Sequence, residues 1–395
     1  MHRNMRATRW LIVLGSVALL GTACGSTTGS ARSTTSATPS VWHFPPNPVT
    51  QPATTVATAA RQLNQCQPVA PAPTLAPAIS SSRNLVIAVL AGGSKFVVRD
   101  VTDINHPSTV GTFDFASRPK FVGASDVSYV DGDGNLVRLT YSSSRKLTVA
   151  RCVSLFDWSL DGTALAYLSQ TDSGSELRLL RGGVDRSLGP IPDTGVGGCE
   201  SIAGCAIANS VDYRLSYSPD GAFISLVLGG IGTSVFRIWS SDGKPLEGSN
   251  SQRATMSAWS GSGLYFRDAQ GVAVWRAGTT AIFLPGVVWI RPDASPAGGQ
   301  IVYVSRDGDG WAHTLVVDTT TRVVRELKAH RSEPVFLTSR YIWYQGERDC
   351  VPADGCGTNP PFHPASGKTY IYDLQDGTET GSVITSVADV WPHAA

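Results

Sequence analysis

A unit of about 40 residues recurs from residue 84 to the end of this chain, and it restricts the fold more than any other feature of the sequence. Each copy has an apolar strand, a turn rich in Ser, Asp, Gly or Pro, and a second apolar strand. The copies are FDWSLDGTALAYLS from Phe156, LSYSPDGAFISLVL from Leu215, MSAWSGSGLYFRD from Met256, IRPDASPAGGQIVYVS from Ile290, and the weaker PKFVGASDVSYVDG from Pro119 and PVFLTSRYIWYQG from Pro334. Repetition at this period without a helical pattern is typical of β-propellers.

The spacing of the copies predicts the number of blades. Second strands of the unit are expected to begin near residues 85, 127, 164, 223, 263, 301 and 341, at spacings of 42, 37, 59, 40, 38 and 40 residues. We therefore expect an all-β propeller of seven blades, each of four antiparallel strands, with six or eight blades as alternatives. The copy at residue 85 lacks an inner strand, whereas VADVWPHAA at the end of the chain is an inner strand without a successor. We expect strands from both ends of the domain to close the ring, because closure removes open sheet edges.

The Ser-Pro-Asp-Gly turn between two apolar strands, clearest in the copies from Phe156 and Leu215, resembles the repeat of TolB-like propellers. That family is related to WD40 proteins, whose Gly-His and Trp-Asp signatures this chain lacks. The resemblance covers residues 84–395 and implies the propeller fold. TolB proteins have an N-terminal α/β domain, six blades and no lipid anchor, so their envelope partner does not transfer to residues of this chain.

Residues 1–23 have the pattern of a bacterial export signal. Three arginines precede the apolar run WLIVLGSVALLGTA, which is shorter than the roughly 20 residues that a membrane-spanning helix needs. The run ends at Gly21-Thr22-Ala23-Cys24, which resembles the lipobox of bacterial lipoproteins and implies cleavage before Cys24 and lipidation of its thiol. The alternative is an ordinary secretory signal with an incidental cysteine. We expect a protein held at the cell membrane by lipid and facing outside the cytoplasm.

Residues 24–83 are expected to form a tether between the lipidated cysteine and the propeller of residues 84–395. Ser, Thr, Ala and Pro dominate this segment, and few of its side chains could bury apolar area. The chain has 32 basic and 31 acidic residues, and removal of the signal with its three arginines leaves 29 basic residues and a net charge near −2. This balance offers no basic face to nucleic acid and no polybasic patch to a membrane.

Seven cysteines leave six for disulfides once Cys24 takes lipid, which suits an oxidising compartment. Of the fifteen pairings, sequence proximity favours Cys199–Cys205, Cys350–Cys356 and Cys66–Cys152. In an up-and-down blade, the links between blades lie on the same face as the turns between second and third strands. We call this side the loop face and the side with the Ser-Pro-Asp-Gly turns the turn face. All three disulfides are expected on the loop face, where long loops form a recognition surface or are merely insertions.

Further polar residues on the loop face are candidates for binding a partner. They lie in turns and in an insertion after the segment YIWYQG, and they are Asp131, Asp133, Asp307, Asp309, Asp349, Thr358 and His363. Two turns contain Asp-Gly-Asp-Gly, whose aspartates are spaced as in calcium loops, but neither copy has the bidentate Glu of such a loop. Asp-Gly is also the common hairpin turn pair, so we expect turns and no cofactor, with calcium as the weaker alternative.

No catalytic or metal-binding constellation stands out in the sequence. It contains no G-x-S-x-G nucleophile elbow, no H-E-x-x-H and no phosphate-binding glycine loop. We therefore predict a lipid-anchored binding module whose partner is an envelope protein or a cell-wall component and not a nucleic acid. The alternatives are a metal-dependent hydrolase or lactonase with its site at the central channel, and a structural component of the envelope.

Overall fold

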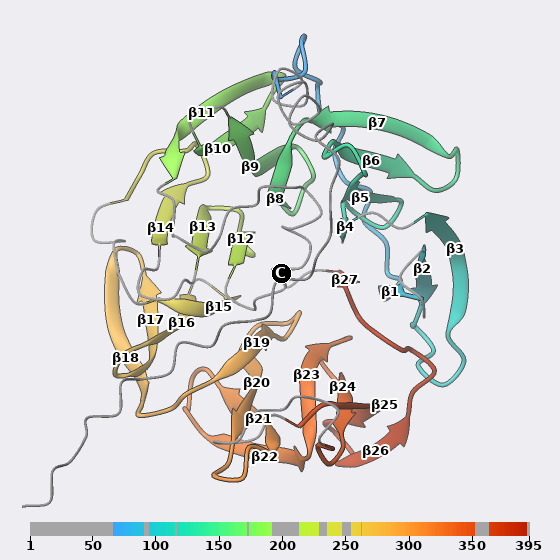
Figure 1. The fold of residues 1–395 in the computed structure, drawn as a ribbon, viewed down its shortest axis with the longest axis vertical. Helices are drawn as coiled ribbons and strands as arrows, with labels where there is room; N and C mark the ends of the chain where they lie inside the picture. The colour runs from blue at the N-terminus through green and yellow to red at the C-terminus, as the bar shows by residue number, and fades with distance from the viewer. Residues whose placement is uncertain are drawn as a thin grey trace, which may run out of the picture. The chain divides into compact units, whose positions relative to one another are not determined.

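A computed structural model describes residues 66–90, 95–114, 117–171, 174–191, 213–228, 235–246, 254–261, 263–351 and 363–392. Within these ranges the chain forms strands and no helix, and hence no helix that could cross a membrane. The strands form seven antiparallel sheets, six of four strands and one of three. The sheets are arranged radially around a central axis as the blades of a propeller (Figure 1). The predicted all-β fold with seven blades is confirmed.

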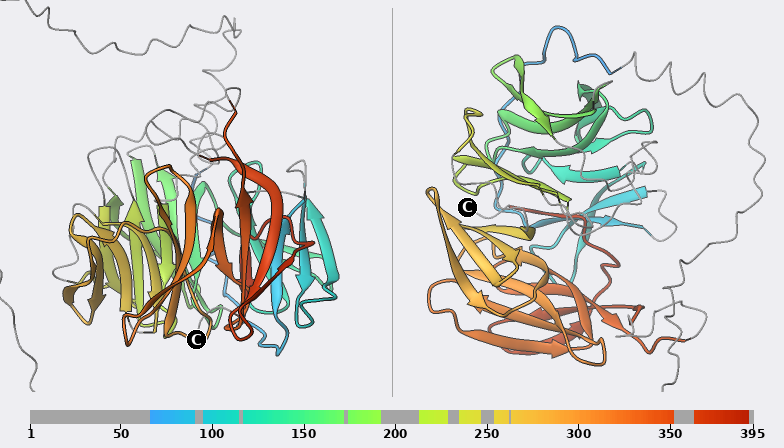
Figure 2. Two further views of the ribbon diagram at one scale, coloured as in Figure 1. Left: turned by 90° about the horizontal axis from the view of Figure 1, so that it is seen from below. Right: turned by 60° about the vertical axis from the view of Figure 1, so that its left-hand side comes forward.

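Each blade begins next to the axis and ends at the rim, and its strands run between the two faces of the ring (Figure 2). Blades 1 to 3 contain β27 (Asp389–Trp391), β1 (Leu85–Val89), β2 (Lys95–Asp100), β3 (Ser108–Asp114); β4 (Ser117–Phe121), β5 (Asp126–Val130), β6 (Leu136–Thr140), β7 (Arg145–Ala150); and β8 (Val153–Trp158), β9 (Ala164–Thr171), β10 (Gly174–Arg181), β11 (Val184–Ile191). Blades 4 and 5 contain β12 (Tyr213–Tyr217), β13 (Phe223–Leu228), β14 (Val235–Ser240); and β15 (Thr255–Ser260), β16 (Gly263–Asp268), β17 (Gly271–Arg276), β18 (Thr279–Pro285). Blades 6 and 7 contain β19 (Ile290–Ala294), β20 (Gln300–Arg306), β21 (Ala312–Asp318), β22 (Val324–Ala329); and β23 (Arg331–Phe336), β24 (Tyr341–Glu347), β25 (Ala365–Asp373), β26 (Thr378–Gly381).

The second strands begin where the repeat predicts them. They start at residues 85, 126, 164, 223, 263, 300 and 341, each within one residue of the expected position. Local turn chemistry accounts for this agreement. The carboxylates of Asp161 and Asp220 accept the backbone N–H groups of Thr163 and Ala222, each at 3.0 Å, and so fix the turns that precede β9 and β13.

The two ends of the domain share the first blade. Strand β27 pairs antiparallel with β1, so that Leu85 lies opposite Trp391 and Ile87 lies opposite Asp389. The last strand of the chain is therefore the innermost strand of blade 1, beside the axis (Figure 1). The predicted closure of the ring by strands from both ends is confirmed.

The core of the described residues consists of seven apolar clusters, each between two neighbouring blades. One of them joins blade 7 to blade 1 through Trp343 and Val86, which completes the ring. Hydrogen bonds also cross between blades. The indole N–H of Trp158 in blade 3 donates to the hydroxyl of Ser128 in blade 2 at 2.8 Å. Large apolar side chains that bridge blades in this way hold the inner strands at fixed positions around the axis.

A strap, residues 66–83, packs against blades 2 and 3 before the first strand begins (blue in Figure 1). A disulfide joins Cys66 to Cys152 in the link between the two blades, as sequence proximity predicts. Leu75 of the strap is 6% exposed and belongs to the apolar cluster between these blades. The last part of the predicted tether is therefore bound along the propeller. In the sequence, the one leucine of the strap is only a weak indication of this packing, because Ala and Pro surround it.

Hydrogen bonds to its backbone hold the strap against blades 2 and 3 as far as the turn face. The guanidinium of Arg138, in a buried ion pair with Asp126, donates to the carbonyl of Ala76 at 2.8 Å. Further along, the N–H of Ala78 donates to the carbonyl of Asp161 at 2.6 Å. The strap therefore crosses from the loop face to the turn face between blades 2 and 3.

Candidate binding site

The central channel contains a cavity of about 530 Å³ lined by the inner strands. This volume lies within the range typical of ligand sites in proteins. Eight charged side chains line it, four cationic and four acidic: Arg118, Lys120, Arg214 and Arg291, and Asp157, Asp293, Glu333 and Asp389. Because these residues come from six different blades, the cavity exists only in the closed ring.

Three of the acidic residues hold neighbouring blades together. They occupy the same register position on their inner strands, each paired with the third residue of the adjacent second strand. Each carboxylate accepts a backbone N–H from the inner strand of the next blade. These bonds join Tyr217 to Asp157 at 2.7 Å, Phe336 to Asp293 at 2.8 Å, and Phe121 to Asp389 at 2.7 Å. The repeated geometry shows that these carboxylates are structural.

Bulges direct four side chains toward the cavity. The inner strands of blades 2, 5, 6 and 7 each have a register shift, and the residue at the shift has a positive φ. These residues are Arg118 (56°), Met256 (48°), Arg291 (49°) and Glu333 (57°). Residues other than glycine rarely adopt this left-handed backbone conformation, and those that do are concentrated at functional sites. Arg291 and Glu333 form an ion pair across two blades.

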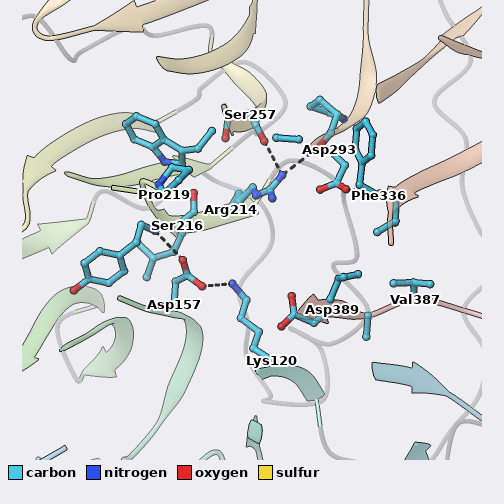
Figure 3. Close-up of a pocket in the computed structure, with 18 of the residues that line it drawn as sticks. Lys120, Asp157, Arg214, Ser216, Pro219, Ser257, Asp293, Phe336, Val387 and Asp389 are labelled. Atoms are coloured by element: carbon cyan, nitrogen blue, oxygen red, sulfur yellow. Dashed lines mark hydrogen bonds and ion pairs between the residues drawn. The ribbon is translucent and has the colours of Figure 1, made fainter. Parts of the chain in front are cut away.

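Two arginines of the channel lack a carboxylate partner among the described residues. Arg118 forms neither a hydrogen bond nor an ion pair with any of them. The guanidinium of Arg214 donates only to backbone carbonyls, at 2.8 Å to Ser257 and 3.3 Å to Pro292. Figure 3 shows Arg214 extending toward Ser257 and Asp293, while Lys120 points at Asp157, to which it donates at 2.6 Å.

Burial affects the ionisation of these groups. It lowers the pKa of the Arg118 guanidinium, and no opposing carboxylate offsets this cost to the charged form. Burial raises the pKa of Asp293 above its usual value, although the nearby Arg214 opposes the rise. Burial likewise raises the pKa of Glu333, against the influence of Arg291. The channel is therefore a partly desolvated environment in which a bound anion would interact strongly with arginine.

The predicted loop-face residues form two separate groups. In the first, Asp131 caps its own turn and accepts the N–H groups of Asp133 and Asn135 at 3.0 and 2.9 Å. The carbonyl of Gly134 in this turn accepts the N–H of Val153 at 2.9 Å, beside the disulfide of Cys152. This group therefore lies at blades 2 and 3.

The second group lies at blades 6 and 7 and is built around Trp311. Its indole ring is stacked between the imidazoles of His330 and His363, with ring centroids 3.9 and 3.5 Å away. The ring nitrogens of His363 lie 3.3 Å from the carbonyl oxygen of Arg348 and 3.2 Å from that of Asp309. The structure thus brings Asp309 and His363 together, next to Asp349, at the base of the insertion.

Asp307 has the same role in the second group as Asp131 has in the first. Its carboxylate accepts the N–H groups of Asp309 and Trp311 at 3.0 and 2.9 Å, which is the geometry of a hairpin turn. Within the part of the chain that the structure describes, no group of three or more His, Cys, Asp or Glu side chains could hold a metal ion. Cys350 is disulfide-bonded. Several predicted residues lie outside the described ranges: Cys24, Cys199, Cys205, Cys356 and Thr358.

The channel residues do not stand out in the sequence, because each inner strand contributes only one or two of them. Alignment of the inner strands by register would have revealed a signal. The segments FDW, RPDA and VADV place aspartate at one equivalent position, and RPK and RPD place arginine two residues earlier. Charged residues on the most buried strand of a repeat indicate a lined channel.

Comparisons with known proteins concern the fold. No family model matches the sequence, and no curated protein matches it. Among solved structures, the chain is similar to TolB from Acinetobacter baumannii, with 17% identity over 61% of this chain and 62% of that chain and a TM-score of 0.40. A puromycin-hydrolyzing peptidase from Mycobacterium tuberculosis has 14% identity over 76% and 52% of the chains and a TM-score of 0.47. A prolyl endopeptidase has 12% identity over 82% and 52% of the chains and a TM-score of 0.50. This chain thus spans less than two thirds of the length of each of these three chains, and at such low identity the likeness concerns the fold alone.

Proposed function

We propose that the protein is an exported, lipid-anchored binding module of the cell envelope that takes an acidic ligand into the central channel of its propeller. The unpartnered guanidinium of Arg118 carries this proposal. A partly buried charge without a counter-charge is unfavourable, and an incoming carboxylate or phosphate would offset its desolvation. Arg214 is positioned to contribute, since its hydrogen bonds to described residues run from Nη1 alone, to two backbone carbonyls.

None of the acidic residues of the channel supplies the counter-charge that Arg118 lacks. Asp157, Asp293 and Asp389 are held by backbone N–H groups of the next blade, and Glu333 pairs with Arg291. Their positions are therefore fixed by the architecture of the blades, and none of them pairs with Arg118. A ligand that brings its own acidic group meets a site with rigid walls, which lowers the entropic cost of binding.

Lipid anchoring supports a role at the membrane surface. The export signal, the lipobox-like segment before Cys24 and the Ser/Thr/Ala/Pro-rich segment are the sequence features behind this part of the proposal. Two acyl chains suffice for stable anchoring, whereas one binds marginally. Replacement of Cys24 by Ala should move the protein from the membrane fraction to the soluble fraction. Retention of the variant in the membrane would contradict lipidation at this cysteine.

Photo-crosslinking in living cells tests the binding site directly. A crosslinking amino acid at Val387, which lines the channel, should capture a specific acidic molecule, and one at Thr358 in the insertion should not. Arg118→Asn should abolish capture, because it removes the charge while Asn tolerates the left-handed backbone. Arg322→Asn is the matched control, since Arg322 also has a positive φ of 61° but lies exposed in a turn outside the channel.

Two results would contradict the proposal. Capture from Thr358 alone would assign binding to the loop face and leave the channel without a role. Capture from Val387 that Arg118→Asn does not weaken would show that the ligand is recognised by something other than this guanidinium.

A further inference from the structure

The register position of the three structural aspartates forms one level of the inner strands, and this level is acidic. Each blade contributes one residue to it, paired with the third residue of the adjacent second strand; from blade 1 to blade 7 these residues are Asp389, Lys120, Asp157, Ser216, Ala258, Asp293 and Val335. The level thus holds three aspartates and one lysine. Because Lys120 forms its ion pair with Asp157, the excess negative charge of the level lies at Asp293 and Asp389.

Asp293 forms no ion pair with the residues that the structure describes, and its carboxylate accepts the N–H of Phe336 at 2.8 Å. The guanidinium of Arg214 is near, but its Nη1 donates to backbone carbonyls instead. Burial, together with the negative charge of Asp389, raises the pKa of Asp293 by more than Arg214 and the backbone N–H groups lower it. The ionised carboxylate of Asp293 therefore has too little positive charge around it.

A ligand in the channel can reach this carboxylate. Asp293 and Asp389 both line the cavity and are half-buried. At their level only Val335 of blade 7 lies between them. Figure 3 shows both aspartates on the side of the pocket next to Phe336 and Val387. An ammonium group, with three N–H donors and a positive charge, would be attracted by both carboxylates.

The free cation of the channel lies one level away from this acidic pair. Arg118 precedes Lys120 by two residues on β4, just as Arg291 precedes Asp293 by two residues on β19, so Arg118 lies nearer to the loop face than Asp293. Two residues of a strand span about 6.5 Å. An extended dipeptide has a similar length, roughly 7 Å. One short ligand can therefore meet Arg118 with its acidic group and Asp293 with an amine.

The overall charge of the channel favours the same class of ligand. Its four cationic and four acidic side chains balance each other when all are ionised. A ligand with one negative and one positive group keeps this balance. A purely anionic ligand would add negative charge to a partly desolvated cavity that already contains four acids.

We propose that the acidic ligand of the channel is a zwitterion of about the length of a dipeptide, whose carboxylate binds Arg118 and whose ammonium group binds between Asp293 and Asp389. The inference rests on the proposed function, because it concerns the same cavity and the same acidic group. It adds that the channel prefers an acid that carries an amine over an acid of the same size without one.

Saturation-transfer NMR on the full-length protein in detergent tests this preference with three probes of one size: dialanine, N-acetyl-dialanine and dialanine amide. At pH 6.5 the terminal amine of dialanine, with a pKa of about 8, is protonated. Dialanine should bind saturably and about tenfold more tightly than N-acetyl-dialanine, which lacks the ammonium group. Dialanine amide, which lacks the carboxylate, should also bind more weakly than dialanine.

Asp293→Asn should remove the preference for the amine. Asn has the same shape, and its carbonyl oxygen can still accept the N–H of Phe336. The variant should bind dialanine about tenfold more weakly than the parent protein does, and N-acetyl-dialanine at least as tightly, which shows that its channel is folded. Asp318→Asn is the matched control and should change neither affinity, because Asp318 also accepts backbone N–H groups but lies at the end of β21, outside the channel.

The outcomes separate this inference from the proposed function. Equal affinity of the parent protein for dialanine and N-acetyl-dialanine, an unchanged preference in Asp293→Asn, or no binding of any probe would overturn the inference. Capture of an acidic molecule from Val387 would still support the proposed function in each of these cases. Arg118→Asn should weaken both dialanine and N-acetyl-dialanine, and binding of both that this variant leaves unchanged would contradict the proposed function as well.

Discussion

On the loop face, the first aspartate of each Asp-Gly-Asp-Gly turn accepts hydrogen bonds from its own turn, whereas in the central channel Arg118 projects from its strand without a counter-charge. Both regions contain several charged residues close together. Only the second leaves a partly buried charge unsatisfied. The partners of a charged group, and not its presence on a loop, therefore distinguish a binding site from a structural one.

Removal of the Cys66–Cys152 disulfide should lower the free energy of unfolding more than any other change considered. Such a loss would show that this covalent linkage on the loop face stabilises the fold. The two cysteines are 86 residues apart, and the chain-entropy model gives a loss of about 4.5 kcal/mol when both are replaced by Ser. Urea unfolding followed by tryptophan fluorescence measures it. Replacement of Cys350 and Cys356 is the control, since their predicted loop is short and should contribute about 2 kcal/mol or less. Equal losses from both pairs would contradict this account.

The next largest loss of stability is expected from an acidic residue of the channel, and it should exceed the loss from an acidic residue of the loop face. Asp157→Ala should lower the free energy of unfolding by about 2 kcal/mol, because it leaves the N–H of Tyr217 and the ammonium of Lys120 without their acceptor. Asp133→Ala, on the loop face, should change it by less than about 0.5 kcal/mol, since it removes an exposed side chain. Urea unfolding of both variants measures the difference. A loss for Asp157→Ala as small as the loss for Asp133→Ala would mean that this channel acid is not structural.

Much of the fold follows from the sequence because its signals are local. Apolar runs and an aspartate that caps the following turn place the second strands to within one residue, and an unpaired inner strand at the end predicts the closure by β27. The candidate sites are different. Arg118 and Arg214 are far apart in the sequence and meet only around the axis, and Asp293 lies near Asp389 only because the last strand closes the ring. Unsatisfied groups are properties of the packed structure, so sequence pattern alone does not identify them.

A moderate effect is expected from the stack at the base of the insertion. Trp311→Ala removes two ring contacts, to His330 and His363, each of the kind that contributes about 0.5–1.5 kcal/mol. We expect a loss of about 1–2 kcal/mol in urea unfolding, with capture from Val387 unchanged. Trp311→Phe should recover part of the loss, since it keeps an aromatic ring between the imidazoles. Loss of capture in Trp311→Ala would show that the loop face and the channel are coupled, which contradicts their separate roles.

The smallest effect is a pH dependence at the loop face. Burial lowers the pKa of His313, but its hydrogen bonds to Asp307 and Glu326 outweigh burial and raise the pKa above the usual 6.5. The hydrogen bond from His313 lowers the pKa of Asp307 below its usual 3.8. The contribution of His313 is therefore fully present below pH 6.5 and lost as the pH rises through its folded pKa, and that of Asp307 is lost as the pH falls through its own folded pKa.

Substitution of this histidine tests the sign of that dependence. His313→Gln should destabilise the protein most between about pH 4 and 6.5 and least above the folded pKa of His313, as measured by thermal unfolding across pH. The control is His106→Gln, because His106 and its partner Asp103 are 84% and 63% exposed and solvent screens their pair. A difference between His313→Gln and the parent protein that grows toward alkaline pH would show that this histidine is neutral in the folded state. Its bond to Asp307 would then be an ordinary hydrogen bond and not part of the ionic capping that sets the loop face apart from the channel.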